Sequence, residues 1–304
     1  MKYQIETIGV ELEYADIDTR KPLPKGLRWD YKDYSMCNSN GTANDPKKRM
    51  NVFGSEIHTK PTAEISEIMF LVSRFQQGFP EAKLNYTTNL HIHIRVPGLR
   101  NDLDALKKLA SYYHKNAIPL FKLLPHIPIP IRENFKKEKA FDGAYRRYKR
   151  RHRSHQYIAS ENVFDQLMEA KTTEDFNLAH YPRDKKGKPQ LHLMQREGVN
   201  LAHLFKPTET IEFRHFTMTK KPNRFHTALI WPRLYLKAAL YTDEPPESII
   251  KRHKELEFQP FFKYRYSLDK IFRRTNYGLH SREEIEAEYQ RLIRKGKLTL
   301  EDLR

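Results

Sequence analysis

The chain has 304 residues, of which 38% are hydrophobic and 12% aromatic, enough apolar material for a packed core; this excludes wholesale disorder. The single cysteine, Cys37, cannot form an intramolecular disulfide, and no run of about 18 apolar residues predicts a membrane span. Acidic residues interrupt the N-terminal segment where a signal peptide needs an unbroken apolar run, so we expect a cytoplasmic protein that does not enter membranes.

The net charge is +17, from 55 Lys and Arg against 38 Asp and Glu, and a positive field of this size attracts nucleotides, nucleic acids and other anions. Part of the excess is concentrated in residues 136–155, where nine basic residues stand against two acids. This basic insertion near 132–155 has three interpretations: a solvated amphipathic helix, a site for an acidic or polyanionic substrate, or a nucleic-acid contact through its interleaved tyrosines.

Alternation and turn residues divide the chain into the strands and helices of an α+β protein. A first strand is predicted over Tyr3–Tyr14, followed by a long loop over 16–50, which is rich in Pro, Gly, Asn and Asp. Further strands are predicted over Asn51–Thr59, Asn89–Val96, Leu193 or Val199 to Leu204, and Thr210–Thr217. Helical spacing predicts helices over Ala63–Phe79, Leu103–Leu124, Ser160–Ala170, from Asn223 onward, and Ser281–Lys295. A polar loop is expected between Ala170 and Gln190.

Three predicted strands carry charged or metal-binding side chains two residues apart. These pairs are Glu11/Glu13, His91/His93 and Glu212/Arg214. Because alternate residues of a strand share a face, each pair points to one side while its apolar neighbours point to the other. This pattern is typical of an antiparallel sheet with one buried face and one polar face.

Carboxylates two residues apart repel each other, so a sheet that also brings Glu56 and Glu212 close needs cations between them. Oxygen-rich ligation with an imidazole suits Mg²⁺, or Mn²⁺, better than zinc. Arg214 adds a fork for a phosphoryl oxygen. Taken singly, each pair is also explained as a solvated strand edge or an ordinary surface pair. Their recurrence on one side of alternating strands favours a site.

Five motifs resemble those of the amidoligase family in order and spacing: GVELE at 9–13, SEIHTKPT at 55–62, NLHIHIRV at 89–96, REGVNL at 196–201 and TIEFRHF at 210–216. The resemblance implies a glutamine synthetase-like fold, in which a curved, mainly antiparallel sheet covered by helices forms a funnel for Mg-ATP and an acid substrate. It also implies an amidoligase-like catalytic domain over residues 1–245. Residues 246–304 would then be a C-terminal helical extension.

The resemblance assigns roles to individual residues. The metal ligands would be Glu11, Glu13, Glu56, Glu212 and one histidine, with His93 preferred to His91. Arg214 would contact the transferred phosphoryl group, and the nucleotide phosphate or substrate carboxylate would be held by Arg196 and Asn200, with Lys60 as a further nucleotide-binding residue. The expected catalytic residues are therefore Arg214, Arg196 and Glu212. The implied reaction activates a carboxylate with ATP as an acyl phosphate, which an amine then attacks.

Two functions of other classes explain part of the same pattern. A metal-dependent nuclease or phosphoesterase would use the acids and histidines for cleavage without ATP. A nucleic-acid-binding protein with a degenerate ligase fold would use the basic stretch at 136–155 and would need no metal. A ligase needs both a metal-binding carboxylate and a phosphoryl-binding arginine, and the joint presence of Glu212 and Arg214 favours it.

Overall fold

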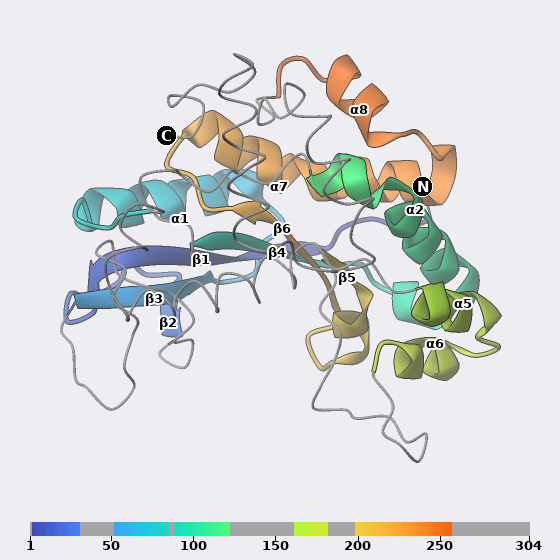
Figure 1. The fold of residues 1–304 in the computed structure, drawn as a ribbon. Coiled ribbons are helices and arrows are strands. Elements are labelled where there is room, and N and C mark those ends of the chain that lie inside the picture. Colours follow the sequence, from blue (N-terminus) through green and yellow to red (C-terminus); the bar gives the residue numbers. More distant parts are fainter. Residues whose placement is uncertain (1, 31–51, 85–87, 122–160, 182–197, 257–304) are drawn as a thin grey trace, which may run out of the picture.

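The computed structural model describes residues 2–30, 52–84, 88–121, 161–181 and 198–256. Its centre is one open antiparallel sheet (Figure 1) whose six strands are β1 (Thr7–Asp18), β2 (Leu27–Asp30), β3 (Val52–Thr59), β4 (Asn89–Arg95), β5 (Val199–Asn200) and β6 (Thr210–Thr217). The strands lie in the order β2-β3-β1-β4-β6-β5, and every neighbouring pair is antiparallel. The prediction of a mainly antiparallel sheet accompanied by helices is confirmed.

The α-helices are α1 (Ile65–Gly78), α2 (Leu103–Phe121), α5 (Glu161–Glu169), α6 (Thr173–Ala179), α7 (Pro222–Lys237) and α8 (Pro246–Arg252). Short 3-10 segments form η1 (Leu99–Asn101) and η3 (Leu201–Phe205), and a π-helical turn, η4 (Ala238–Thr242), continues α7. None of these described helices combines the length and hydrophobicity that crossing a bilayer requires.

Helices α1 and α7 cover one face of the sheet (Figure 1). The buried residues of α1 recur at helical spacing, at Ile68, Leu71, Val72 and Phe75, so one stripe of the helix faces the strands. Aromatic contacts join the two layers, because the rings of Tyr14 and Phe75 lie 4.9 Å apart and those of Phe213 and Tyr235 lie 5.2 Å apart.

The apolar residues of the central strands point toward these helices. Ile8, Val10 and Leu12 of β1 are buried, and they alternate with the charged residues of the same strand. Burying a side chain of this size stabilises the fold by about 1.5–3 kcal/mol. The predicted division of the sheet into an apolar and a polar face is therefore present in the structure.

Helix α2 fixes the short strand β5 beside β6. The Gly198 backbone N–H donates a hydrogen bond to the Tyr113 hydroxyl of α2 at 3.0 Å. The Gly198 carbonyl in turn accepts from the Arg214 N–H at 2.7 Å. The backbone of β6 is thereby connected to the helical layer through one residue.

The prediction of a continuous loop over 16–50 is wrong at its N-terminal end. Strand β1 continues through a bulge at Asp16, whose φ of 56° suits an aspartate, to the fully buried Ile17. Residues Leu27–Asp30 then form the edge strand β2, in which Trp29 packs edge-on against Phe79 with ring centroids 5.8 Å apart. Residues 31–50 lie outside the described residues.

Two further predictions need correction. The strand expected to reach Leu204 ends at Asn200, because the Asn200 side chain accepts a hydrogen bond from the Ala202 N–H at 3.2 Å and starts the turn of η3. The polar loop predicted before Gln190 contains α6, which begins with a reciprocal capping box between Thr172 and Asp175.

The remaining predictions concern the C-terminal part and the basic segment. Helix α8, at the start of the predicted extension, contributes the buried Ile249 to the same core as the sheet. The basic insertion near 132–155 and the helix predicted over 281–295 lie outside the described residues.

Candidate metal centre

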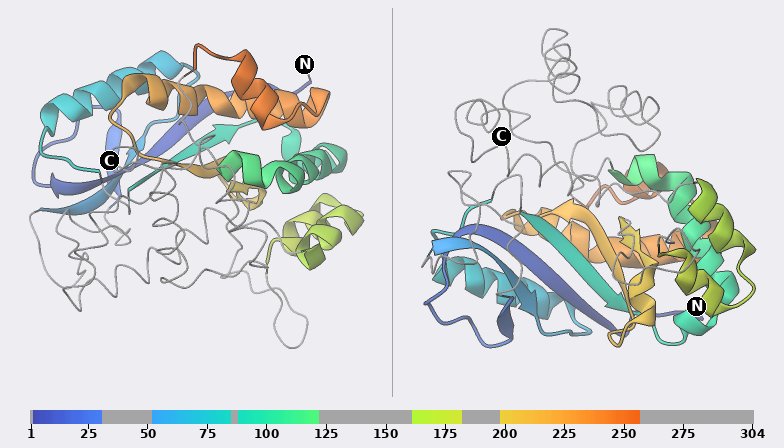
Figure 2. Two further views of the ribbon diagram at one scale, coloured as in Figure 1. Left: turned by 45° about the horizontal axis from the view of Figure 1, so that its top comes forward. Right: turned by 60° about the horizontal axis from the view of Figure 1, so that its bottom comes forward.

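The polar face of the sheet lies opposite α1 and α7, and the right-hand view of Figure 2 looks onto it. The register brings polar residues from four strands into adjacent positions. Glu11 of β1 faces His58 of β3 on one side and His91 of β4 on the other. His93 of β4 faces Glu212 of β6. Directly opposed residues have Cβ atoms roughly 5 Å apart, so these side chains interact across the strands.

The first group of potential metal ligands consists of Glu11, His91 and Glu212, whose ligand atoms all lie within 4.8 Å of one another. The His91 Nδ1 atom lies 2.8 Å from Glu11 Oε2 and 3.8 Å from Glu212 Oε1. Two carboxylates and one imidazole, on three rigid strands, fit a divalent cation that prefers oxygen ligands. The group therefore suits Mg²⁺ or Mn²⁺.

A second group joins Glu11 to Glu56 and His58 of β3. The His58 Nε2 atom lies 2.5 Å from Glu56 Oε1. On its other side, His58 Nδ1 lies 3.3 Å from an Arg28 nitrogen. Because a guanidinium only donates, this contact needs Nδ1 as the acceptor and the proton on Nε2, so Nε2 can bind a cation only in the other tautomer, without the Arg28 contact. Glu11 thus belongs to both groups, and one carboxylate connects two candidate cation sites.

Glu212 and Arg214 form a buried ion pair at the β6 end of this face. Both are more than 90% buried, the Arg214 guanidinium donates to Glu212 Oε1, and the Asn200 amide donates to Glu212 Oε2 at 2.8 Å. Burial alone would raise the pKa of Glu212, but the charge of Arg214 and the neighbouring histidines hold it well below its usual range. The carboxylate is therefore ionised and oriented from two sides.

Each oxygen of the Glu11 carboxylate lies close to a histidine. The Nε2 atom of His93 lies 3.0 Å from Glu11 Oε1, while His91 lies against Oε2. Burial opposes both charges, yet the attraction raises the pKa of His93 and lowers that of Glu11 well below its usual range. His93 therefore supplies part of the positive charge that this carboxylate requires.

The two histidines differ in position, and the position of His93 does not support the ligand role that the family resemblance implied for it. His91 Nδ1 belongs to the compact first group with Glu11 and Glu212. His93 instead connects Glu11 with Thr210 Oγ1, which lies 3.2 Å from its Nδ1 atom. The geometry therefore favours His91 as the metal ligand and His93 as the residue that orients Glu11.

Other predicted residues have different positions. Glu13 is fully buried, and its Oε2 atom accepts hydrogen bonds from the backbone and side chain of Asn89 at 2.7 and 2.9 Å, so this oxygen holds β1 to β4. Glu13 belongs to neither of the two groups found among the described residues. Lys60 is exposed just after β3. Arg196 lies outside the described residues.

Sequence reasoning missed His58 and His203. The signal for His58 was present, because it stands two residues after Glu56 and repeats the spacing of the other pairs. His203 lies on η3, outside any alternating strand pattern, so the sequence gives no sign of its position. Its Nε2 atom is 3.4 Å from Glu212 Oε2. Burial lowers the pKa of His203 to about 4 despite the opposing effect of Glu212. It is a neutral neighbour of the site.

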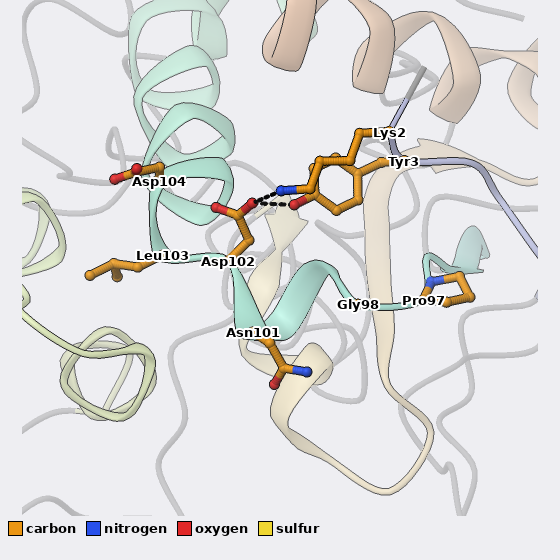
Figure 3. A pocket seen from close by; sticks show the side chains of 8 residues that line it. All are labelled: Lys2, Tyr3, Pro97, Gly98, Asn101, Asp102, Leu103 and Asp104. Atoms are coloured by element: carbon orange, nitrogen blue, oxygen red, sulfur yellow. Dashed lines mark hydrogen bonds and ion pairs between the residues drawn. The ribbon is translucent and has the colours of Figure 1, made fainter.

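A separate hollow lies where the N-terminal segment meets the start of α2 (Figure 3). Asp102 accepts hydrogen bonds from Lys2 Nζ at 2.6 Å and from the Tyr3 hydroxyl through Oδ2, while its Oδ1 accepts from the Ala105 N–H at 2.9 Å and caps α2. Both oxygens of the Asp102 carboxylate therefore accept hydrogen bonds, and they hold the N-terminal segment to the start of α2.

Comparisons of the chain with models of known protein families, with curated proteins and with solved structures found no match. The arrangement of side chains on the polar face, together with the order of the motifs along the chain, is therefore the basis for proposing a function.

Proposed function

We propose that this protein is an ATP- and Mg²⁺-dependent carboxylate-amine ligase of the amidoligase type, with a glutamine synthetase-like sheet and funnel. One observation carries the proposal: Glu11 is shared by two groups of metal-binding side chains, and Arg214 lies beside Glu212 of the first group. Phosphoryl transfer depends on cations and an arginine that neutralise and position phosphate oxygens. An open antiparallel sheet with one polar face is compatible with this fold.

The residues of the two groups would hold Mg²⁺, with Mn²⁺ as an alternative. Glu11, His91 and Glu212 would form one site, and Glu11, Glu56 and His58 the other. When bound, the ions would neutralise the charge of the nucleotide phosphates. The donor chemistry fits because carboxylates dominate both groups and no cysteine is among them.

The other residues of the face would position the reactants. Arg214 would donate to an oxygen of the transferred phosphoryl group, and Asn200 would keep Glu212 in orientation. A carboxylate oxygen of the substrate attacks the γ-phosphorus of ATP, and the bond to ADP breaks. The amine nitrogen then attacks the acyl carbon, phosphate leaves with the bonding electron pair, and the nitrogen loses a proton. These steps form an amide bond and consume one ATP.

The nucleotide site is tested by the shift in melting temperature that ATP causes with and without Mg²⁺. A ligand that binds only the folded state raises the melting temperature. We expect a Mg²⁺-dependent shift in the wild type that is lost in Glu212→Gln. The matched control is Glu64→Gln, which makes the same change at an exposed position before α1. Comparing ligand-induced shifts removes any effect of the substitution on the unliganded protein.

Amide formation is then tested by ADP release from ATP with pairs of acids and amines. We expect release that requires both an acid and an amine. An unchanged ATP shift in Glu212→Gln would contradict the proposed site. Cleavage of DNA or RNA in the presence of Mn²⁺ without ATP would instead identify the metal centre as that of a nuclease or phosphoesterase.

A further inference from the structure

Two exposed cations extend the polar face at its β2–β3 edge. Arg28 of β2 lies directly opposite His58 in the register and contacts its ring at 3.3 Å. Lys60 follows His58 by two residues, and its backbone N–H donates to the Gly26 carbonyl at 2.9 Å, so the ladder continues to this point. Because opposed and alternate residues share a face, both cations lie on the side of the metal groups.

Among the residues that the structure describes, no carboxylate lies within ion-pair distance of Arg28 or Lys60. By contrast, Lys21 pairs with Glu81, and Arg95 pairs with Glu6 and Glu209. The guanidinium of Arg28 has five N–H donors, and its contact with His58 uses one. Arg28 and Lys60 thus form a pair of positive charges beside the second metal group, and such a pair suits an anionic group of the substrate.

The position of this pair separates it from Arg214. Strands β3, β1 and β4 lie between β2 and β6. With a strand spacing of about 4.8 Å, the backbones of Arg28 and Arg214 lie roughly 19 Å apart across the sheet. If Arg214 serves the transferred phosphoryl group, the β2 side is the place for the part of the acid substrate that points away from ATP.

We propose that Arg28 and Lys60 form an anion subsite for a second, non-reacting carboxylate of the acid substrate. The substrate class would then be a dicarboxylic acid, of which one carboxylate is activated near the metal groups and the other is held at the sheet edge. This inference rests on the proposed ligase function and specifies its acid. It also assigns Lys60 to the acid substrate, whereas the family resemblance implied that Lys60 binds nucleotide.

The test compares dicarboxylates with monocarboxylates of equal length. Binding of succinate and butyrate, and of glutarate and valerate, is measured by calorimetry on the full chain with Mg²⁺ and a non-hydrolysable ATP analogue. We expect the dicarboxylates to bind more tightly in the wild type. Arg28→Gln and Lys60→Gln should each weaken dicarboxylate binding by about tenfold or more, as expected for a lost charge-assisted hydrogen bond. Monocarboxylate and nucleotide affinities should stay unchanged.

Lys108→Gln, which removes a charge from an exposed position of α2, should leave all these affinities unchanged. Equal binding of dicarboxylates and monocarboxylates by the wild type would overturn the proposal. So would a loss of nucleotide affinity in Arg28→Gln or Lys60→Gln, because the pair would then serve the phosphates. A wild type that binds the nucleotide analogue but shows no dicarboxylate preference disproves the subsite alone, whereas failure to bind the analogue disproves the ligase function itself.

Discussion

Glu11 and His91 face each other across β1 and β4, with Oε2 and Nδ1 2.8 Å apart. The same carboxylate lies against His93 through Oε1 and belongs to both candidate metal groups. Two histidine contacts and both candidate metal groups thus converge on one side chain. Its replacement should affect the polar face more widely than that of any single partner.

The shared position of Glu11 predicts different metal stoichiometries for two variants. We expect two Mn²⁺ per chain in the wild type with a non-hydrolysable ATP analogue, because each group provides one site. Glu56→Gln should retain one ion, whereas Glu11→Gln should weaken both. Calorimetric titration with Mn²⁺ measures the stoichiometry. Loss of only one ion in Glu11→Gln would show that the groups are independent.

The two histidines of β4 should differ in their effect on metal affinity. His91→Gln removes a nitrogen of the first group and should lower Mn²⁺ affinity by more than about a hundredfold. His93→Gln removes a residue that orients Glu11 and should cost about tenfold to a hundredfold, as is usual for partners of metal ligands. The same titration separates the two. A larger loss in His93→Gln would return the ligand role to His93.

The ion pair of Glu212 and Arg214 predicts a non-additive effect on stability. Arg214→Met leaves the Glu212 carboxylate buried without its cation, which should cost about 3–5 kcal/mol of unfolding free energy. Adding Glu212→Gln to that variant should recover part of the loss, because the uncompensated charge disappears. Urea unfolding of both single variants and the double variant gives the coupling energy. Additive losses would mean that the pair contributes no mutual stabilisation.

The N-terminal attachment predicts a graded effect at Asp102. Asp102→Ala removes the cap of α2 and the partner of Lys2 and Tyr3, and should destabilise the fold by about 1–2 kcal/mol. Asp102→Asn keeps a side-chain oxygen for the cap and should cost less than half of that. Thermal or urea unfolding measures both. Equal losses would show that charge, rather than capping, dominates this position.

Buried His180 predicts a loss of stability in acid. Burial lowers its pKa to about 4, while an unfolded chain titrates near 6.5. As the pH falls below 6.5 the unfolded state takes up the proton first, so stability decreases until the pH reaches about 4, by up to about 3 kcal/mol. His180→Gln should flatten this part of the pH profile of urea unfolding. His226→Gln, at an exposed position of α7, is the control and should leave the slope unchanged.

The sequence predicted those parts of the fold in which one strand face is apolar. Alternation in β1, β4 and β6 is regular enough to assign both faces, and it indicated Glu11, His91, His93, Glu212 and Arg214 correctly as residues of the polar side. Strand β2 was missed because four residues flanked by turn formers carry too short an alternating pattern. Its Arg28 was therefore missed as well.

The register between neighbouring strands could not be predicted from the sequence. The choice between His91 and His93 depends on which of them lies opposite Glu11, and that is decided by strand pairing and by the irregularity between Leu90 and Ile92. Glu13 looked equivalent to Glu11 along β1, but its position beside Asn89 gives it a structural contact. His203 depends on a 3-10 turn that has no periodic signature.

Two hydrogen bonds join Tyr113 of α2 to Gly198 and Gly198 to the backbone of Arg214. Through them α2 helps to position a residue of the polar face. Since β5 pairs with β6 at only two described positions, Val199–Phe213 and Asn200–Glu212, this link adds a helix to the elements that position the backbone of Arg214. The position of Arg214 on the polar face therefore depends on helix α2 as well as on the neighbouring strands.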